Sequence, residues 1–388
     1  MNDAMAIELA EQPEVWARLW ARRGELVEEV GPLLGGLRRV VFAGCGDCHA
    51  AAEYGEALLQ LRSGMETYAF PAMELTRART YLLNEQTLLV AMSVSGRTPR
   101  VVEAARAARR RGARVLGLTD APESPLTESA SGTFVLGTAP PESLETTDYR
   151  DPEAARYRGY QRAVPQTKTF GAMQLAAAMV GLELERRRPS GRGSDRATVE
   201  RTFASLPDLA DAAAQAGRRA AASLARRAPR EVRMTFCGTG LARGVARFAA
   251  YKLLELACGA AHGEVEEFCH THYLVTGPGD AVAFFAQDER ILARVAEIAP
   301  VVAGEIGASV AVLAGGHLRG GAVSGAFLLP AVPPETFPLL SGLAAGHLTR
   351  DLARAWGRNT DRFRAGREEE RYVRGSTRMI RESAVLDL

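Results

Sequence analysis

Short apolar runs alternate along the first half of the chain with amphipathic segments of helical period. The runs Arg38–Gly44, Thr87–Ser93 and Ala113–Asp120 are each typical of a buried strand, and Pro99–Arg111 has the pattern of a helix between two of them. Strands that alternate with helices indicate a parallel sheet covered by helices on its faces. We therefore expect an α/β fold.

The second half of the chain repeats this pattern. Its expected strands and helix lie at Val232–Gly238, Asp280–Gln287, Ala308–Ala314 and Asp288–Ala303. Gly44 recurs as Gly238, at an offset of 194 residues. We interpret the chain as a duplicated domain whose copies are joined by the polar segment Arg186–Asp195. Before this linker, Val164–Leu184 is expected to be a long helix after a turn at Pro165, and Thr138–Tyr160 a surface loop.

Size and charge limit the classes of function. The 388 residues exceed the roughly 250–300 at which a single core stops growing, so two domains are expected. A net charge of +2 offers no basic face for nucleic acid, and no apolar run approaches the roughly 18 residues of a membrane span. With no recognisable signal peptide and an odd number of cysteines, five, we expect a cytoplasmic protein without a disulfide framework.

Small hydroxyl residues follow the strand Thr87–Ser93. The loop Ser93–Thr98 leads directly into a helix, where backbone N–H groups and the helix dipole favour an anion. Ser93, Ser95 and Thr98 can donate hydrogen bonds to it, and Gly96 allows a close approach of the backbone. The alternative is a helix N-cap without a ligand, because Ser and Thr are favoured there as well.

Lysine is rare in this chain, which has 48 basic residues of the Lys and Arg types and only two lysines, Lys168 and Lys252. Lys252 and Glu255 are the only charged residues of the segment 248–258 and lie three apart, on one face of a helix. They continue an apolar row, so both should face inward. A buried acid and base this close are candidate catalysts, and the alternative is a structural ion pair.

Two further clusters could hold a metal or a redox centre. The segment Glu264–His272 contains carboxylates, a thiol and imidazoles, all of which are metal ligands. We favour an acid/base role for His270 instead, because the ligands are crowded along one short segment. The pattern C-x-x-C-H at Cys45–His49 matches a haem attachment or redox motif, but it falls on a tight turn between a strand and a helix, and we expect neither use.

Five segments stand in order along nearly the whole chain: Ile7–Pro13, Ser93–Thr98, Val164–Phe170, Lys252–Glu255 and Glu267–His270. They resemble, in this order, the E-I-x-E-Q-P opening, the S-x-S-G-x-T loop, the V-x-S-T-K-A-F segment, the K-x-K-E and the E-L-K-H of the sugar isomerase (SIS) family. The likeness is to the isomerase half of glucosamine-6-phosphate synthase and to fructosamine-phosphate deglycases.

The resemblance implies a fold and a division of the chain. We expect two tandem SIS domains, each a parallel sheet flanked by helices in a flavodoxin-like three-layer sandwich. Residues 1–190 would form the first domain, with the N-terminal helix and the phosphate loop. Residues 197–357 would form the second, with the Lys252–Glu255 helix, and residues 358–388 a tail that closes over the site.

The resemblance also implies roles for single residues. In the family the S-x-S-G-x-T loop binds sugar phosphate, the glutamate of K-x-K-E is the enolisation base, and the histidine of E-L-K-H assists ring opening from the neighbouring subunit. We therefore expect catalytic roles for Glu255, His270 and Lys252, in a homodimer with a shared active site and with neither cofactor nor metal. The residues expected to bind substrate and phosphate are Gly46, Cys48, Ser93, Val94, Ser95, Gly96, Thr98, Gln166, Thr167 and Lys168.

Departures from the family pattern bear on the reaction. The G-T-S turn of the family is Gly46-Asp47-Cys48 here, the region 361–388 contains no lysine, and no glutaminase segment precedes the first domain. These departures disfavour aminotransfer. We expect proton transfer at C1 and C2 of a phosphorylated sugar or amino sugar through an enediol or enamine, in an isomerase or a deaminase (deglycase). The alternative is a non-catalytic sugar-phosphate sensor.

Overall fold

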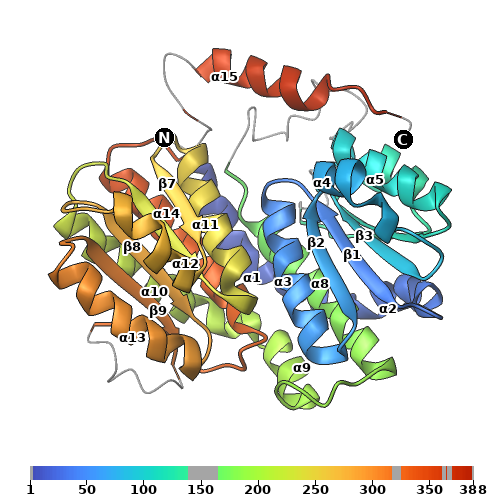
Figure 1. Ribbon diagram of the computed structural model, residues 1–388, viewed down its shortest axis with the longest axis horizontal. Helices are drawn as coiled ribbons and strands as arrows, with labels where there is room; N and C mark the ends of the chain where they lie inside the picture. Colours follow the sequence, from blue (N-terminus) through green and yellow to red (C-terminus); the bar gives the residue numbers. More distant parts are fainter. Residues whose placement is uncertain (1–2, 139–164, 317–324, 361–363, 365–368, 387–388) are drawn as a thin grey trace. The chain divides into compact units, whose positions relative to one another are not determined.

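A computed structural model describes residues 3–138, 165–316, 325–360, 364 and 369–386. The chain divides into two compact units, each with one five-stranded sheet (Figure 1). Unit 1 comprises Met1–Glu14, Val164–Thr167 and Ser194–Gly366, and unit 2 comprises Val15–Ala163, Lys168–Gly193 and Arg367–Leu388. The first turns of helix α1 (Ala4–Ala21) therefore belong to unit 1 and the rest of that helix to unit 2.

The sheet of unit 2 is parallel throughout and has the strand order β2-β1-β3-β4-β5, which is the flavodoxin-like order. Its strands are β1 (Arg39–Gly44), β2 (Glu66–Pro71), β3 (Thr87–Met92), β4 (Arg114–Thr119) and β5 (Gly132–Val135). Its helices are α2 (Arg23–Val30), α3 (Asp47–Ser63), α4 (Ala72–Ala78), α5 (Pro99–Arg110), α6 (Pro125–Ser129), α8 (Lys168–Arg187) and α15 (Glu369–Ser376).

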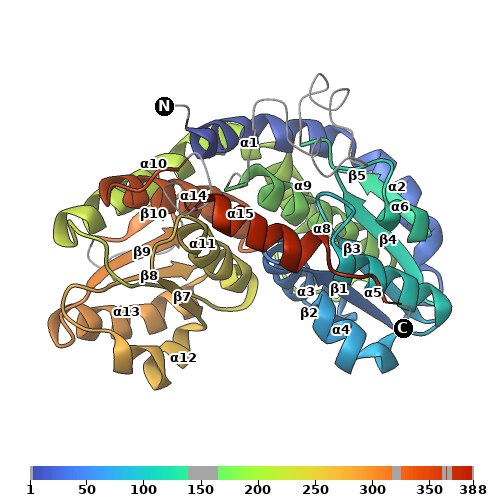
Figure 2. The same ribbon diagram turned by 90° about the horizontal axis from the view of Figure 1, so that it is seen from above.

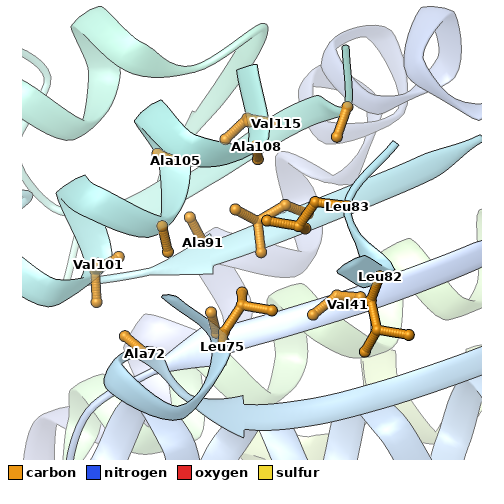
Figure 3. Packing of buried hydrophobic residues seen from close by; sticks show 14 of the residues in the cluster. Val41, Ala72, Leu75, Leu82, Leu83, Ala91, Val101, Ala105, Ala108 and Val115 are labelled. Carbon is orange, nitrogen blue, oxygen red and sulfur yellow. The ribbon is translucent and has the colours of Figure 1, made fainter. Parts of the chain in front are cut away.

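Alternate side chains of the strands of unit 2 face the two helical layers. Val41 of β1 and Val115 of β4 pack with Val101 of α5 and Leu75 of α4 in one cluster of buried residues (Figure 3). On the opposite face, the ring of Phe42 lies so close to α3 that a Cβ on Gly55 would be 2.8 Å from it. Strand β3 is buried along its whole length because helices cover both faces.

The sheet of unit 1 is also parallel, and its order β7-β6-β8-β9-β10 is that of unit 2 when the strands are taken in sequence. Its strands are β6 (Met234–Gly238), β7 (Ala260–Gly263), β8 (Ala281–Ala286), β9 (Ser309–Gly315) and β10 (Phe327–Leu329). Its helices are α9 (Arg196–Ala204), α10 (Leu206–Arg227), α11 (Arg243–Glu255), α12 (Val265–His270), α13 (Glu289–Gly304) and α14 (Phe337–Ala355). Helices α12 and α13 pack on one face in a cluster that includes Phe268, Phe284 and Val295 (Figure 2).

The strands and helices expected from the two repeated patterns are confirmed to within two residues at each end, and so is the parallel α/β fold with three layers in each unit. The long helix expected after a turn at Pro165 is α8, which begins at Lys168, because Pro165, Gln166 and Thr167 have no regular structure. The predicted linker is also partly helical, since α8 continues to Arg187. The predicted loop Thr138–Tyr160 lies outside the described residues except for Thr138.

None of the helices in the described part of the chain combines the length and the apolar character that a bilayer-spanning segment requires. The three domain boundaries predicted from the sequence stay predictions.

Candidate functional site

The loop between β3 and α5 in unit 2 is folded around two hydroxyl groups. Ser93 is buried, and its Oγ lies 2.9 Å from the Oγ1 of Thr98. Thr98 is the N-cap residue of α5, yet its side chain makes no capping hydrogen bond to the helix. The alternative, that Thr98 serves only as a helix N-cap, is therefore not supported, because its hydroxyl does not cap α5.

Gly96 forms the tight turn of this loop. Its φ is +61°, in the left-handed region, and its N–H donates to the carbonyl of Ser93 at 3.0 Å. A Cβ at this position would clash with Ser124, which lies directly behind the loop. The sequence predicted that Gly96 lets a ligand approach the backbone. The close neighbour in the structure is the side chain of Ser124, and the approach of a ligand stays a prediction.

Strand β4 holds the loop from behind through Val94. The Val94 carbonyl accepts hydrogen bonds from the N–H of Asp120 at 2.9 Å and from the Oγ1 of Thr119 at 3.1 Å. The Asp120 carboxylate in turn accepts the N–H and the hydroxyl of Thr138. Burial raises the pKa of Asp120, while the Thr138 hydrogen bonds and the positive charge of Lys168 act in the opposite direction.

The start of α3 contributes Gly46, just before the helix, and Cys48 in its first turn. Gly46 has φ +55° and is the N-cap residue of α3. Burial raises the pKa of the Cys48 thiol to about 12, and a backbone hydrogen bond from Val94 only partly offsets it. Cys48 is thus an uncharged thiol in contact with the backbone of the Ser93–Thr98 loop. The pKa of Cys45 is also raised by burial, which argues against a reactive thiolate in the C-x-x-C segment.

A buried ion pair stands at the end of α11 in unit 1. The Nζ of Lys252 lies 2.7 Å from the Oε2 of Glu255; the lysine side chain is 0% exposed and the glutamate side chain 25%. The predicted inward row is confirmed for Val245, Phe248 and Lys252, which are all buried. The ammonium holds the carboxylate in place, and part of the carboxylate side chain is exposed. A molecule that contacts the exposed side can donate a proton to it.

Gln166 and Thr167 lie beside this pair in unit 1. The Nζ of Lys252 donates to the carbonyl of Gln166 at 2.9 Å, and the N–H of Thr167 donates to the Oε2 of Glu8 at 3.1 Å. Glu8 was not among the predicted site residues. The signal that could have found it is a carboxylate on the apolar face of α1, next to Leu9.

Both lysines of the chain are buried. Lys168 is 1% exposed at the first residue of α8 in unit 2, and Lys252 is 0% exposed in unit 1. Solvated positive charges are carried by arginine throughout the chain, so lysine is found where an ammonium is enclosed by protein. This placement disfavours the explanation that the two lysines occur by chance.

His270 stands apart from the groups above. It ends α12, its side chain is 68% exposed, and its Nε2 lies 3.6 Å from the Oε1 of Glu266. The neighbouring Glu264 is used structurally, since its carboxylate accepts the N–H groups of Glu266 and Glu267 at the start of α12. Within the residues that the structure describes, no three acidic, thiol or imidazole side chains converge as a metal site requires.

The predicted residues thus form two groups. Cys48, Ser93, Val94, Gly96 and Thr98 adjoin one another in unit 2, and Lys252, Glu255 and Gln166 are in contact in unit 1. A shallow depression of about 350 Å³ in unit 2 involves neither group. It lies at the start of β2, around Glu66 and Arg192, away from the carboxyl ends of the strands where ligands of such sheets bind.

Comparisons with known proteins concern the family and the fold. Residues 34–148 match the model of the SIS domain. The chain is 25% identical over 368 residues, 93% of its length, to the glutamine–fructose-6-phosphate aminotransferase (isomerizing) of Pyrococcus horikoshii, and covers 56% of that protein. Over the curated relatives that it matches, the chain spans between 16% and 56% of their length.

Solved structures show the same fold over nearly the whole chain. The C-terminal domain of glucosamine-fructose-6-phosphate aminotransferase from Francisella tularensis superposes with a TM-score of 0.77 at 16% identity, covering 92% of this chain and 97% of that one. Tagatose-6-phosphate ketose/aldose isomerase from Escherichia coli gives 0.69 at 18% identity, covering 93% and 96%. The chain therefore contains a SIS domain and has the two-sheet α/β fold of tandem SIS proteins.

Proposed function

We propose that this protein moves a proton between C1 and C2 of a phosphorylated sugar or amino sugar, as an aldose–ketose isomerase or as an aminosugar-phosphate or fructosamine-phosphate deaminase. The observation that carries the proposal is the pair Lys252–Glu255, in which the ammonium is enclosed and the carboxylate is partly exposed. The exposed side of this carboxylate is open to a molecule from outside the protein. A general base must be open in this way to reach its substrate.

The phosphate is assigned to the loop of unit 2. Ser93, Ser95 and Thr98 supply hydroxyl groups, and the start of α5 supplies backbone N–H groups and the positive end of a helix dipole. Cys48 replaces a hydroxyl by an uncharged thiol beside the same loop, with Gly46 in the turn before it. Gln166, Thr167 and Lys168 complete the proposed substrate-binding set.

The proton moves through Glu255. Its carboxylate removes a proton from the carbon next to the carbonyl or imine group, which leaves an enediol or enamine, and returns the proton to the neighbouring carbon. Lys252 holds this carboxylate in place at 2.7 Å. His270 is proposed to assist ring opening in the site of a second copy of the chain, a role supported by its 68% exposure.

Deuterium exchange tests the chemistry. The protein is incubated in D2O with 6-phosphates of fructose, glucosamine and fructosamine, and proton NMR follows the C1 and C2 signals. Exchange by the wild type that Glu255→Gln loses, and that Glu305→Gln at an exposed site on unit 1 retains, is the expected result. The product separates isomerase from deaminase. Binding of a panel sugar without exchange in the wild type would overturn the proposal in favour of a sugar-phosphate sensor.

Mixing two inactive variants tests the shared site. When subunits of Glu255→Gln and His270→Ala exchange, each mixed dimer contains one site with both native residues, so activity should return to about a quarter of the wild-type value. No recovery, with dimer exchange verified by mass, would place both residues in the site of a single copy.

A further inference from the structure

The peptide group between Gln166 and Thr167 has a charged partner at each end. Lys252 donates to its carbonyl oxygen at 2.9 Å, and its N–H donates to the Oε2 of Glu8 at 3.1 Å. The C=O and the N–H belong to one planar unit and point in opposite directions. The cation therefore faces the negative end of the peptide dipole and the anion faces the positive end, which fixes the orientation of the whole group.

This arrangement is enclosed by protein. Glu8 is 3% exposed, Thr167 1% and Lys252 0%. In such surroundings hydrogen bonds to charged groups are strong, and a group that loses its partner pays the full cost of its lost hydration. Each member of the set therefore depends on the others for its place.

Glu8 itself is held by the packing of α1 on α14. A Cβ on Gly346 of α14 would lie 2.5 Å from the Cδ2 of Leu9, so the two helices are in contact next to Glu8. At the start of α1, the Asp3 carboxylate accepts hydrogen bonds from Arg350 at 2.7 Å and from Thr360 at 2.9 Å. The carboxylate of Glu8 thus projects from a helix that is fixed on both sides of it.

We propose that Glu8 is a positioning residue for Lys252, and through Lys252 for Glu255. Glu8 orients the Gln166–Thr167 peptide group, and the carbonyl of that group fixes one N–H of the Lys252 ammonium. The ammonium is thereby held where its Nζ lies 2.7 Å from the Oε2 of Glu255. The proposal rests on the proposed function only where it makes Glu255 the base. The connection from Glu8 through this peptide group to Lys252 can be tested without any substrate.

The rarity of lysine makes this test simple. Protein labelled with [13Cε]lysine gives two ε-CH2 signals, one from Lys168 and one from Lys252, and Lys252→Met identifies the second. Glu8→Gln keeps an acceptor for the Thr167 N–H and removes the charge. It should shift the Lys252 signal and leave that of Lys168 in place, whereas Glu14→Gln, at an exposed position of the same helix, should shift neither. An unmoved Lys252 signal in Glu8→Gln would overturn the proposal.

Turnover provides the second measurement. Glu8→Gln should lower kcat roughly ten- to hundred-fold at unchanged KM, because misplacement of a reacting group affects the chemical step while the phosphate loop is untouched. The double variant Glu8→Gln with Lys252→Met should be no slower than Lys252→Met alone. Losses that multiply would mean that Glu8 acts on the fold in general and not through Lys252.

The two proposals fail in different ways. A wild type that catalyses no exchange on any sugar refutes the proposed function, while the lysine spectra still decide the link between Glu8 and Lys252. An active wild type whose Glu8→Gln variant keeps both kcat and the Lys252 signal refutes the positioning role alone.

Discussion

The packing around Lys252 predicts that arginine is a worse replacement for it than methionine, although arginine keeps the charge. The ammonium is enclosed, with Glu255 at 2.7 Å, the Gln166 carbonyl at 2.9 Å and the ring centroid of Phe248 at 5.3 Å. A guanidinium is larger, planar and directed as a fork, and these three partners do not form the flat, paired acceptor that it matches. Arg62 shows the contrast, since it is buried against the Glu185 carboxylate at 2.6 Å.

The magnitudes can be worked from these contacts. Inserting a larger side chain into a filled site costs about 1–3 kcal/mol, so Lys252→Arg should lose about 2 kcal/mol, or roughly 4–8 °C in Tm. Methionine has nearly the length of the lysine stem. It forfeits the charged hydrogen bond to the Gln166 carbonyl, worth about 1.5–3 kcal/mol, and the ion pair with Glu255. It also removes a buried cation whose lost hydration costs several kcal/mol. These terms nearly cancel, and Glu255 can regain water on its exposed side.

Thermal unfolding followed by circular dichroism, with urea titration as a second measure, compares the two variants. Lys252→Met should unfold within about 1 kcal/mol of the wild type and yet lose proton exchange on the phosphosugar by a factor of about 100 or more, because Glu255 is no longer held. If Lys252→Met proves less stable than Lys252→Arg, the ammonium contributes net stability and this account of the pair is refuted.

Three further predictions concern the loop and the response to pH. Gly96→Ala should destabilise unit 2 by about 2–4 kcal/mol through backbone strain and the clash with Ser124, and urea titration in a Ser124→Gly background should recover most of the clash but not the strain. Burial raises the pKa of Asp3, but hydrogen bonds led by that from Arg350 lower this pKa to about 2. The stability that the Asp3 carboxylate provides is therefore complete above the pKa of the unfolded chain, near 3.8, and is lost as pH falls toward 2. Asp3→Asn should make Tm depend less on pH in that window. Burial lowers the pKa of His347 to about 3, so it takes up a proton on unfolding below about pH 6.5; its imidazole NMR signals should not titrate between pH 5 and 8, and His347→Gln should reduce the loss of Tm from pH 6.5 to 4.

The central strands of both sheets could be predicted from the sequence because they are buried on both faces. The runs in β1, β3 and β8 are continuously apolar, and a glycine or a polar residue ends each of them. The edge strands could not be predicted in this way. β2 (ETYAFP) and β7 (AAHG) are only partly buried, and each pairs with a single neighbour, so neither carries an apolar run.

The residues of the candidate site also fall into those that the sequence predicts and those that it does not. The inward pair of Lys252 and Glu255 follows from helical spacing, and the Ser93–Thr98 loop from its place between a strand and a helix. Glu8 and Asp120 could not be assigned a role, because the carboxylate of each accepts a hydrogen bond from a backbone group far away in sequence: Glu8 from Thr167, and Asp120 from Thr138. Such contacts are set by tertiary packing, so the sequence can show a carboxylate among apolar residues but not the group that it binds.

The carboxyl edge of the unit 1 sheet explains why a single phosphate site per chain is the more economical proposal. There the N–H groups of Arg290 and Ile291 at the start of α13 are taken by the chain's own carboxylate, Asp288, at 2.9 and 3.0 Å. The preceding Gln287 donates to the carbonyl of Thr239 at 3.1 Å. A phosphate at this helix would have to displace a carboxylate that caps it and would be repelled by that charge. In unit 2 the corresponding residue, Thr98, is neutral and leaves the start of α5 without a side-chain cap. The two sheets therefore share a strand order, but the start of α13 in unit 1 repels an anion and the start of α5 in unit 2 favours one. In the proposed function, unit 1 supplies the Lys252–Glu255 pair instead.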